Sequence, residues 1–304
     1  MTIKNPNLVI KVKNKYKNRL IFLIYNFLFY VLKQTHIFAY NLFLLYIEKM
    51  NKINEFSIKE YLQKKNRNID FQIFDTIDST NIYAKKIVKN LTKNTIIISN
   101  SQTNGQGKFG RTFYSPANTG LYMTIVLKDK IETSKVFSIT FLCALAVCKA
   151  IEKLTDVKPK IKWINDIFVK DKKCCGILTE CETNLKTNIS TDIIAGIGIN
   201  INTVKFPKDL KDIAISLQQN DINKNQMTAE IINNFFKFYN NLNIKQIIEK
   251  YKKYCFVLGK DICYTKENIK YIAKAIDIND FGNLIIKDIN GNLQTLEYEE
   301  IKTL

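Results

Sequence analysis

Apolar and polar positions follow one another in short segments from residue 71 onward, in a pattern that predicts strands separated by helices. Residues 71–77 alternate from one side chain to the next, which is typical of a half-buried strand. Ser79 and Thr80 then offer a helix N-cap, and apolar residues recur at helical spacing up to Leu91. Further strands are expected at 95–99, 120–127, 161–163, 167–169, 176–179 and 193–200, and further helices at 136–154 and 227–254. The pattern predicts a mixed α/β domain dominated by a sheet.

A different pattern fills the C-terminal end of the chain. Short strands are expected at 261–264, 270–278, 284–289 and 293–297. The pair Asn290-Gly291 between the last two is a strong signal for a two-residue hairpin. We therefore expect a small barrel-like β domain over residues 255–304, after a main domain over residues 69–254.

Residues 1–68 form an N-terminal extension of another character. Two apolar runs, 20–32 and 37–47, follow a basic stretch, and each is shorter than the roughly 20 residues that cross a bilayer. A basic flank before a short apolar run is typical of a targeting or membrane-associating leader. The alternatives are an amphipathic helix packed on the body, or an extension that is not part of the working protein. We expect an intracellular protein, in the cytoplasm or, with such a leader, in a plastid or mitochondrion.

Positive charge is concentrated in this extension. The 304 residues carry 46 Lys and Arg against 28 Asp and Glu, for a net charge of +18. Residues 1–67 alone hold 13 Lys and Arg against 3 Asp and Glu. A nucleic-acid surface would concentrate charge on the folded body instead, and the apolar runs lack the rhythm of a helix-turn-helix. We therefore expect no nucleic-acid partner.

The histidine and cysteine residues limit the chemistry that a site can use. The single histidine, His36, excludes a site with several histidine ligands and leaves almost no room for a Ser-His-Asp mechanism. The seven cysteines lack the CxxC spacing of a zinc site and are expected to be buried thiols.

Three glycines in a short segment directly after a predicted strand mark the first candidate site. Gly105, Gly107 and Gly110 allow the backbone to approach a ligand closely, and Lys108 and Arg111 add positive charge. These features predict an anionic ligand such as a phosphate or a carboxylate; an ordinary surface loop is the alternative. Neither a dinucleotide-binding fingerprint nor a P-loop fits, because no helix pattern follows and no Gly-Lys-Ser/Thr occurs.

Two further clusters lie on predicted strands. Lys162, Asn165 and Asp166 combine a cation with oxygen ligands at a strand end, which suits a nucleotide with Mg²⁺, although such a group is often only a solvated turn. Gly196 and Gly198 lie within one apolar strand, where glycine often marks close approach by a ligand or another backbone. Tight core packing is the alternative for these two glycines.

Taken in order, five motifs resemble those of the biotin–protein ligase family. They are Ser79-Thr80-Asn81, Gln102-x-x-Gly105-x-Gly107-Lys108-x-Gly110-Arg111, Lys162-Trp163-x-Asn165-Asp166, Lys173-x-x-Gly176-Ile177-Leu178 and Gly196-x-Gly198-Ile199-Asn200. The resemblance spans residues 71–202. It implies an α+β fold, with the mixed-sheet, class II synthetase-like catalytic domain of biotin and lipoate ligases and a small C-terminal SH3-like β-barrel.

The resemblance implies a ligation in two steps, with ATP and biotin as substrates and Mg²⁺ as the accompanying ion. The biotin carboxylate attacks the α-phosphorus of ATP, which gives biotinyl-5′-AMP and pyrophosphate. A lysine amine on the biotin carboxyl carrier domain of a biotin-dependent carboxylase then attacks the mixed anhydride and releases AMP. No enzyme nucleophile is needed, so catalysis would rest on positioning and on fixed positive charge.

The same resemblance assigns roles to individual residues. Phe113 stands where the family usually has Trp and would stack on adenine. Catalysis would rest on Lys173, Arg111, Lys108 and Lys162. Biotin would be bound by Ser79, Thr80, Asn81, Gln102, Gln106, Gly107, Lys108, Lys173, Gly176, Gly196 and Gly198. ATP would be bound by Gly105, Lys108, Arg111, Phe113, Lys162, Asn165, Asp166 and Asn200, with Asp166 as the candidate ligand of Mg²⁺.

The chain departs from the family pattern in the glycine-rich loop, where Gln106 and Lys108 replace two arginines. Lysine keeps the charge of arginine but lacks its planar, two-pronged donor geometry, so we expect a weaker hold on biotinyl-AMP. A lipoate–protein ligase is the nearest alternative, but its typical loop, Arg-Arg-x-Ser-Gly-Gly-Gly, is absent. An inactive adenylate-binding homologue tethered to a membrane is the second alternative. The resemblance also leaves a homodimer open.

Overall fold

The structure is a computed structural model that describes residues 52–184, 186–218, 222–267 and 269–304. The predicted leader therefore lies, up to residue 51, outside the described residues. Residues 53–304 form one compact unit.

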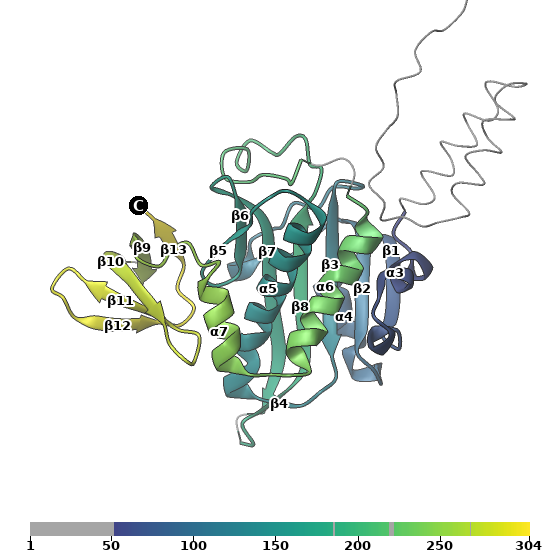
Figure 1. The fold of residues 1–304 in the computed structure, drawn as a ribbon, viewed down its shortest axis with the longest axis horizontal. Coiled ribbons are helices and arrows are strands. Elements are labelled where there is room, and N and C mark those ends of the chain that lie inside the picture. Colours follow the sequence, from purple (N-terminus) through teal and green to yellow (C-terminus); the bar gives the residue numbers. More distant parts are fainter. Residues whose placement is uncertain (1–51, 185, 219–221, 268) are drawn as a thin grey trace, which may run out of the picture. The chain divides into compact units, whose positions relative to one another are not determined.

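A mixed eight-stranded sheet forms the centre of this unit (Figure 1). Its first two strands run parallel and its other neighbours run antiparallel, so the predicted mixed sheet is confirmed. The strand order is β1 (Asp70–Ile77), β2 (Thr95–Gln102), β3 (Gly120–Leu127), β8 (Ile189–Asn200), β7 (Lys172–Asn184), β6 (Asp166–Val169) and β5 (Lys160–Lys162), and the short β4 (Ile131–Glu132) pairs with β8.

Helices cover both faces of the sheet. Successive residues of a strand point to opposite faces, so one strand can contribute apolar side chains to both. Within β2, Ile96 and Ile98 belong to the large core cluster, whereas Ile97 belongs to a smaller one. The large cluster packs the sheet against α3 (Glu55–Tyr61), α5 (Val136–Leu154), α6 (Lys224–Tyr239) and α7 (Ile244–Lys252), and the smaller cluster packs it against α4 (Thr80–Ile87).

The core helix α5 has the bounds that its apolar stripe predicted. With the preceding turn it forms a segment, 133–154, long and apolar enough to cross a membrane. However, 67% of the most apolar part of this segment is buried inside the fold, so its apolar side chains belong to the core.

The single helix predicted over 227–254 is wrong, because the structure has two helices there, α6 and α7. The chain turns at residues 240–243, where three of four residues are asparagine. The Asn243 side chain accepts a hydrogen bond from the backbone N–H of Gln246 at 3.0 Å and so caps α7. Asparagine side chains compete with helical hydrogen bonding and favour caps, which explains the break.

Residues 53–66 pack on the body, although the sequence boundary at residue 68 placed them in the extension. Ile58 of α3 is fully buried, and the following turn spans Lys64–Asn66. The backbone N–H groups of Asn54 and Gln63 donate to side chains of α6 at 2.9 and 3.0 Å. A helix of seven residues shows too little of an apolar stripe to be found from the sequence.

The C-terminal β domain forms a five-stranded antiparallel sheet, as predicted in kind. Gly291 has a φ of +88°, which fits the Asn-Gly turn. Trp163 Nε1 donates to the carbonyl oxygen of Gly282 at 3.0 Å and joins this domain to the main sheet. The strands follow the order β12 (Leu293–Leu296), β11 (Leu284–Asp288), β10 (Ile269–Ile278), β9 (Asp261–Lys266) and β13 (Ile301–Thr303), of which β13 was missed.

Candidate active site

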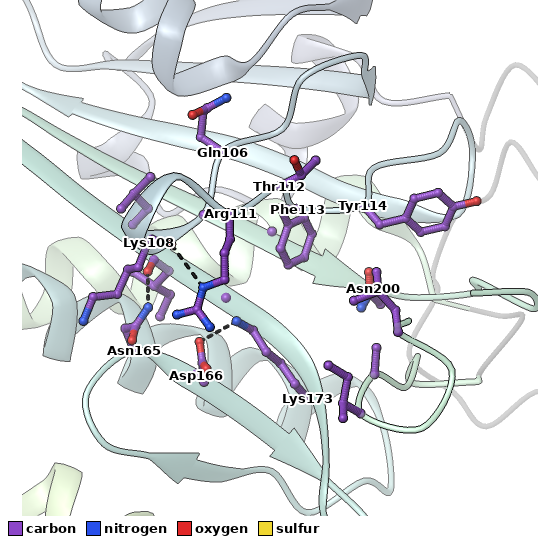
Figure 2. A pocket seen from close by; sticks show the side chains of 18 of the residues that line it. Gln106, Lys108, Arg111, Thr112, Phe113, Tyr114, Asn165, Asp166, Lys173 and Asn200 are labelled. Atoms are coloured by element: carbon purple, nitrogen blue, oxygen red, sulfur yellow. Dashed lines mark hydrogen bonds and ion pairs between the residues drawn. The ribbon is translucent and has the colours of Figure 1, made fainter. Parts of the chain in front are cut away.

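A cavity of about 580 Å³ lies between the glycine-rich loop and the sheet, and the predicted site residues gather around it (Figure 2). Every one of them lines the cavity except Gly105. Gly105 lies beneath the loop, where an added Cβ would come within 2.5 Å of the Phe113 carbonyl oxygen. The five motifs, far apart in the sequence, therefore form one site.

Neutral polar residues line one part of the cavity, among them Thr80, Asn81 and Gln102. The backbone N–H of Thr80, in the first turn of α4, donates to Gln102 Oε1 at 2.8 Å. The amide nitrogen of Gln102 donates in turn to Ser115 Oγ, also at 2.8 Å. Asn81 completes the set, and we call Thr80, Asn81, Gln102 and Ser115 the amide wall. These polar groups are uncharged and are paired within the protein, so the wall does not attract an ionic group.

Asn81 lies over a row of residues that crosses three strands. Thr124 of β3, Gly196 of β8 and Leu178 of β7 are register partners in that row. Thr124 Oγ1 donates to Asn81 Oδ1 at 2.7 Å, and Asn81 Nδ2 donates to the Leu178 carbonyl oxygen at 3.2 Å. A Cβ on Gly196 would overlap Asn81 Oδ1. The predicted close approach at Gly196 is thus made by a side chain of the protein.

Phe113 makes the other close approach to the sheet. Gly176 and Gly198 are register partners on β7 and β8. An added Cβ would lie 2.5 Å from the Phe113 ring at Gly198 and 3.4 Å from it at Gly176. The ring also packs edge-on against Tyr122, with the centroids 6.4 Å apart. Two glycines therefore make the floor on which Phe113 lies, while stacking on adenine stays a prediction.

Basic side chains line another part of the cavity, and we call Lys108, Arg111, Lys162 and Lys173 the basic end. Lys173 Nζ forms an ion pair with Asp166 Oδ1 at 2.7 Å, without the angles of a hydrogen bond. Figure 2 shows the Arg111 guanidinium and the Lys173 ammonium group in the same part of the cavity. With Lys302, five basic side chains line the cavity against the four carboxylates of Asp166, Asp171, Asp212 and Glu300, and this small positive excess favours an anion.

Burial increases this demand for an anion. Loss of solvation lowers the pKa of Lys108 and of Lys162 below the usual value, and Asp166 opposes the shift in both. Arg111 Nη1 lies 2.8 Å from Glu300 Oε1. Burial by itself would raise the pKa of Glu300, but Arg111, together with Lys162 and Lys302, holds that pKa below the usual value. The negative charge of a phosphate would stabilise the protonated form of these buried lysines.

The two predicted asparagines at the nucleotide end differ in what they offer. Asn165 Nδ2 donates to the Ile177 carbonyl oxygen at 2.6 Å, so this amide nitrogen holds β6 to β7. Asn200 Oδ1, in contrast, is buried without a hydrogen-bond partner among the described residues. A buried acceptor without a donor is costly, so Asn200 is ready for a ligand N–H or O–H.

Known proteins resemble the chain across this site. The family model of the Biotin/lipoate A/B protein ligase family matches residues 73–200. BirA of Bacillus subtilis (strain 168), named a bifunctional ligase/repressor, is 30% identical over 254 residues, which are 81% of this chain and 78% of that protein. The chain belongs to the biotin–protein ligase family.

Other members of the family show the same relation. The biotin–[acetyl-CoA-carboxylase] ligase of Paracoccus denitrificans is 29% identical over 126 residues, 41% of this chain and 51% of that protein. The solved biotin protein ligase from Aquifex aeolicus in complex with biotin and ATP has a TM-score of 0.65 at 22% identity, covering 77% of this chain and 99% of that chain. This structure shares the α+β fold, so the predicted fold class is confirmed.

Several residues of the cavity were not predicted from the sequence. Residues 206–214 contribute Phe206 and Leu210, and their backbone clamps the catalytic candidate: Lys173 N–H donates to the Ile213 carbonyl oxygen at 2.9 Å. Glu300 and Lys302 come from the C-terminal domain. No local signal marks these residues, because their role depends on contacts between distant segments.

Mg²⁺ fits the basic end only with help from a substrate. Among the described residues, no group of three or more His, Cys, Asp or Glu side chains could hold a metal ion. Asp166 offers one buried carboxylate oxygen, and Mg²⁺ in proteins is commonly held by one or two carboxylates and substrate phosphates. We therefore treat the ion as part of the MgATP substrate.

Proposed function

We propose that this family member activates biotin as biotinyl-5′-AMP and transfers the biotinyl group to a lysine of a biotin carboxyl carrier domain. One observation carries the proposal: a single cavity joins the amide wall to the basic end. Biotin has an uncharged polar ring system at one end and a carboxylate at the other, and ATP adds phosphates. The two ends of the cavity match these two chemistries.

In the first step, the amide wall holds the ring system of biotin and the basic end holds the triphosphate. A carboxylate oxygen of biotin attacks the α-phosphorus, the bond to the bridging oxygen breaks, and pyrophosphate leaves. We place the reacting α-phosphate beside Lys173 and Arg111, which lie in the same part of the cavity, so that their charges stabilise the negative charge that builds up on the phosphorus oxygens. The reaction needs no nucleophile from the protein.

In the second step, the ε-amine of the acceptor lysine attacks the carbonyl carbon of the mixed anhydride. An amide bond forms, AMP leaves, and the amine proton passes to solvent. The name of the Paracoccus relative supports a carboxylase as the source of the acceptor. In this proposal Lys173 acts at this carbonyl oxygen, and the hydrogen bond from its backbone N–H to the Ile213 carbonyl oxygen fixes the base of its side chain.

Biotin is favoured over lipoate as the acid. The matching family model covers both kinds of ligase and does not separate them. The curated relatives, however, include proteins named for biotin ligation at 24–29% identity. The loop at residues 105–111 also lacks the three consecutive glycines of the lipoate type.

Exchange of labelled pyrophosphate into ATP tests the proposal. The purified chain with MgATP should catalyse exchange when biotin is added and remain inactive with lipoate. Adding an acceptor domain should then give one biotinylated lysine, and an acceptor with that lysine changed to arginine is the control. Exchange that depends on lipoate, or no exchange with either acid, would contradict the proposal.

A further inference from the structure

Glu180 lies outside the predicted site and does not line the cavity. It is on β7, two residues beyond Leu178, and its carboxylate contacts two residues of α4. Glu180 Oε2 accepts a hydrogen bond from Asn81 Nδ2 at 3.0 Å, and Glu180 Oε1 lies 2.6 Å from Lys85 Nζ. Asn81 and Lys85 are one helical turn apart, so one carboxylate spans the first turn of the helix. The mechanism above does not use this carboxylate.

Asn81 depends on Glu180 for one of its partners. The Asn81 side chain is 3% exposed, and its amide nitrogen carries two N–H groups. Two acceptors lie within reach of that nitrogen, the Leu178 carbonyl oxygen and Glu180 Oε2. Removing the Glu180 carboxylate would leave a buried N–H without an acceptor, a costly state that the side chain would escape by turning.

A turn of Asn81 would be passed on to the cavity through its neighbour. The backbone N–H and the hydroxyl of Thr80 both donate to Gln102 Oε1, at 2.8 and 3.2 Å. The first turn of α4 therefore decides which way the Gln102 amide faces. Asn81 itself lines the cavity and lies directly on Gly196, so a turn of its side chain also changes the amide wall directly.

We propose that Glu180 is a positioning residue for the biotin end of the site, acting through Asn81. This inference rests on the proposed function. The ion pair with Lys85 is a minor part of the effect, because the two side chains are 31% and 51% exposed and such pairs contribute little. The acceptor oxygen, rather than the charge, is what holds Asn81.

Three variants of the full chain test the inference. Glu180→Ala removes the acceptor, and Glu180→Gln keeps it while removing the charge. Glu182→Ala is the matched control, because Glu182 lies on the same strand and pairs with Lys89 at 3.2 Å, with side chains 61% and 71% exposed and no contact to the cavity. Calorimetry with biotin alone gives its Kd, and steady-state kinetics give the KM for biotin and for ATP.

The expected result is selective. Glu180→Ala should weaken biotin binding about ten-fold and leave the KM for ATP within about two-fold of wild type. Glu180→Gln should recover biotin binding to within about three-fold of wild type, and Glu182→Ala should match wild type. A general loss of stability would lower the active fraction without this split between the substrates. Thermal unfolding of each variant separates the two cases.

Other outcomes overturn the inference. An unchanged biotin Kd in Glu180→Ala, equal losses for both substrates, or a Glu180→Gln as impaired as Glu180→Ala would each do so. If Glu180→Ala does not fold, Glu180→Met takes its place, since it removes the acceptor oxygens and keeps the length of the side chain. A wild-type chain that binds no biotin overturns the proposed function itself, and only then does the inference fall with it.

Discussion

The amide wall and the basic end are built in opposite ways. Hydrogen bonds within the protein already pair the polar groups of the amide wall, from Thr80 through Gln102 to Ser115. In the basic end, loss of solvation lowers the pKa of Lys108 and of Lys162, and Asp166 only partly opposes the shift. One end is complete without a ligand, and the other is stabilised by an anion.

This difference explains how one cavity holds two unlike substrates in order. A rigid, paired wall selects by shape and loses affinity when its geometry changes, because its hydrogen bonds cannot rearrange without leaving a buried group unpaired. A cluster of cations selects by charge, tolerates small displacements, and acts most strongly where negative charge develops. Changes at the wall should therefore affect biotin binding, and changes at the basic end should affect chemistry and the adenylate.

The largest effect is expected at Lys173, which would act on the reacting atoms. Lys173→Gln should lower the rate of biotin-dependent pyrophosphate exchange about 10²- to 10³-fold, because a fixed charge is lost where the transition state becomes negative. Lys172→Gln is the control, since Lys172 Nζ donates to the Lys211 carbonyl oxygen instead of facing the reaction. A loss below about five-fold would place the Lys173 charge away from the reacting phosphorus and weaken the comparison.

The next largest effect is expected at Gly198 and Gly176, the two glycines under Phe113, and it concerns biotin binding. An alanine Cβ at Gly198 would lie 2.5 Å from the Phe113 ring, which would have to move. At Gly176, the register partner, the Cβ would meet the flexible end of Lys173 at 3.1 Å, and that end can shift. We expect Gly198→Ala to weaken biotin binding about ten-fold and Gly176→Ala less than about three-fold, measured by calorimetry. Equal losses would show that displacement of Phe113, which the resemblance assigns to adenine, does not reach the bound biotin.

Local patterns predicted most of the helices and strands and the part of the cavity that the five motifs line. The helix at 136–154 and the strand at 120–127 have the bounds that their apolar positions gave, because both are buried along their length. The helix predicted at 227–254 failed because propensity at its asparagines outweighed the apolar stripe. Glycine in a strand predicted close approach by a ligand or another backbone at Gly196 and Gly198, but the side chains of Asn81 and Phe113 occupy that space, which corresponds to the packing alternative.

The sequence did not predict the residues that act through tertiary contacts. Glu300 follows Arg111 by 189 positions, and only the fold of the C-terminal domain brings the two side chains together. Glu180 is similar, because its partner Asn81 is 99 positions away. Residues 206–214 reach the site through backbone hydrogen bonds, which any side chain can accompany. The motifs thus locate the groups that face the substrates, but not those that hold them in place.

The smallest effect is expected from Lys108→Arg, which tests whether the basic end holds the adenylate loosely. A guanidinium donates two parallel hydrogen bonds to a phosphate, so release of biotinyl-AMP should slow about three-fold. Burial lowers the pKa of Lys108, so its positive charge is lost as the pH rises through a value below 10.5. Arginine does not titrate there, and the alkaline loss of ATP affinity should therefore move to higher pH in the variant.

Filtration of the labelled adenylate complex measures the release rate, and the KM for ATP across alkaline pH measures the second effect. Lys160→Arg is the matched control, because Lys160 is exposed on the same sheet and does not line the cavity. If neither quantity changes in Lys108→Arg, Lys108 does not touch the phosphate. The basic end would then act through Arg111, Lys162 and Lys173 alone. Its difference from the amide wall would depend on the positions of those three charges and not on the number of charges around the phosphate.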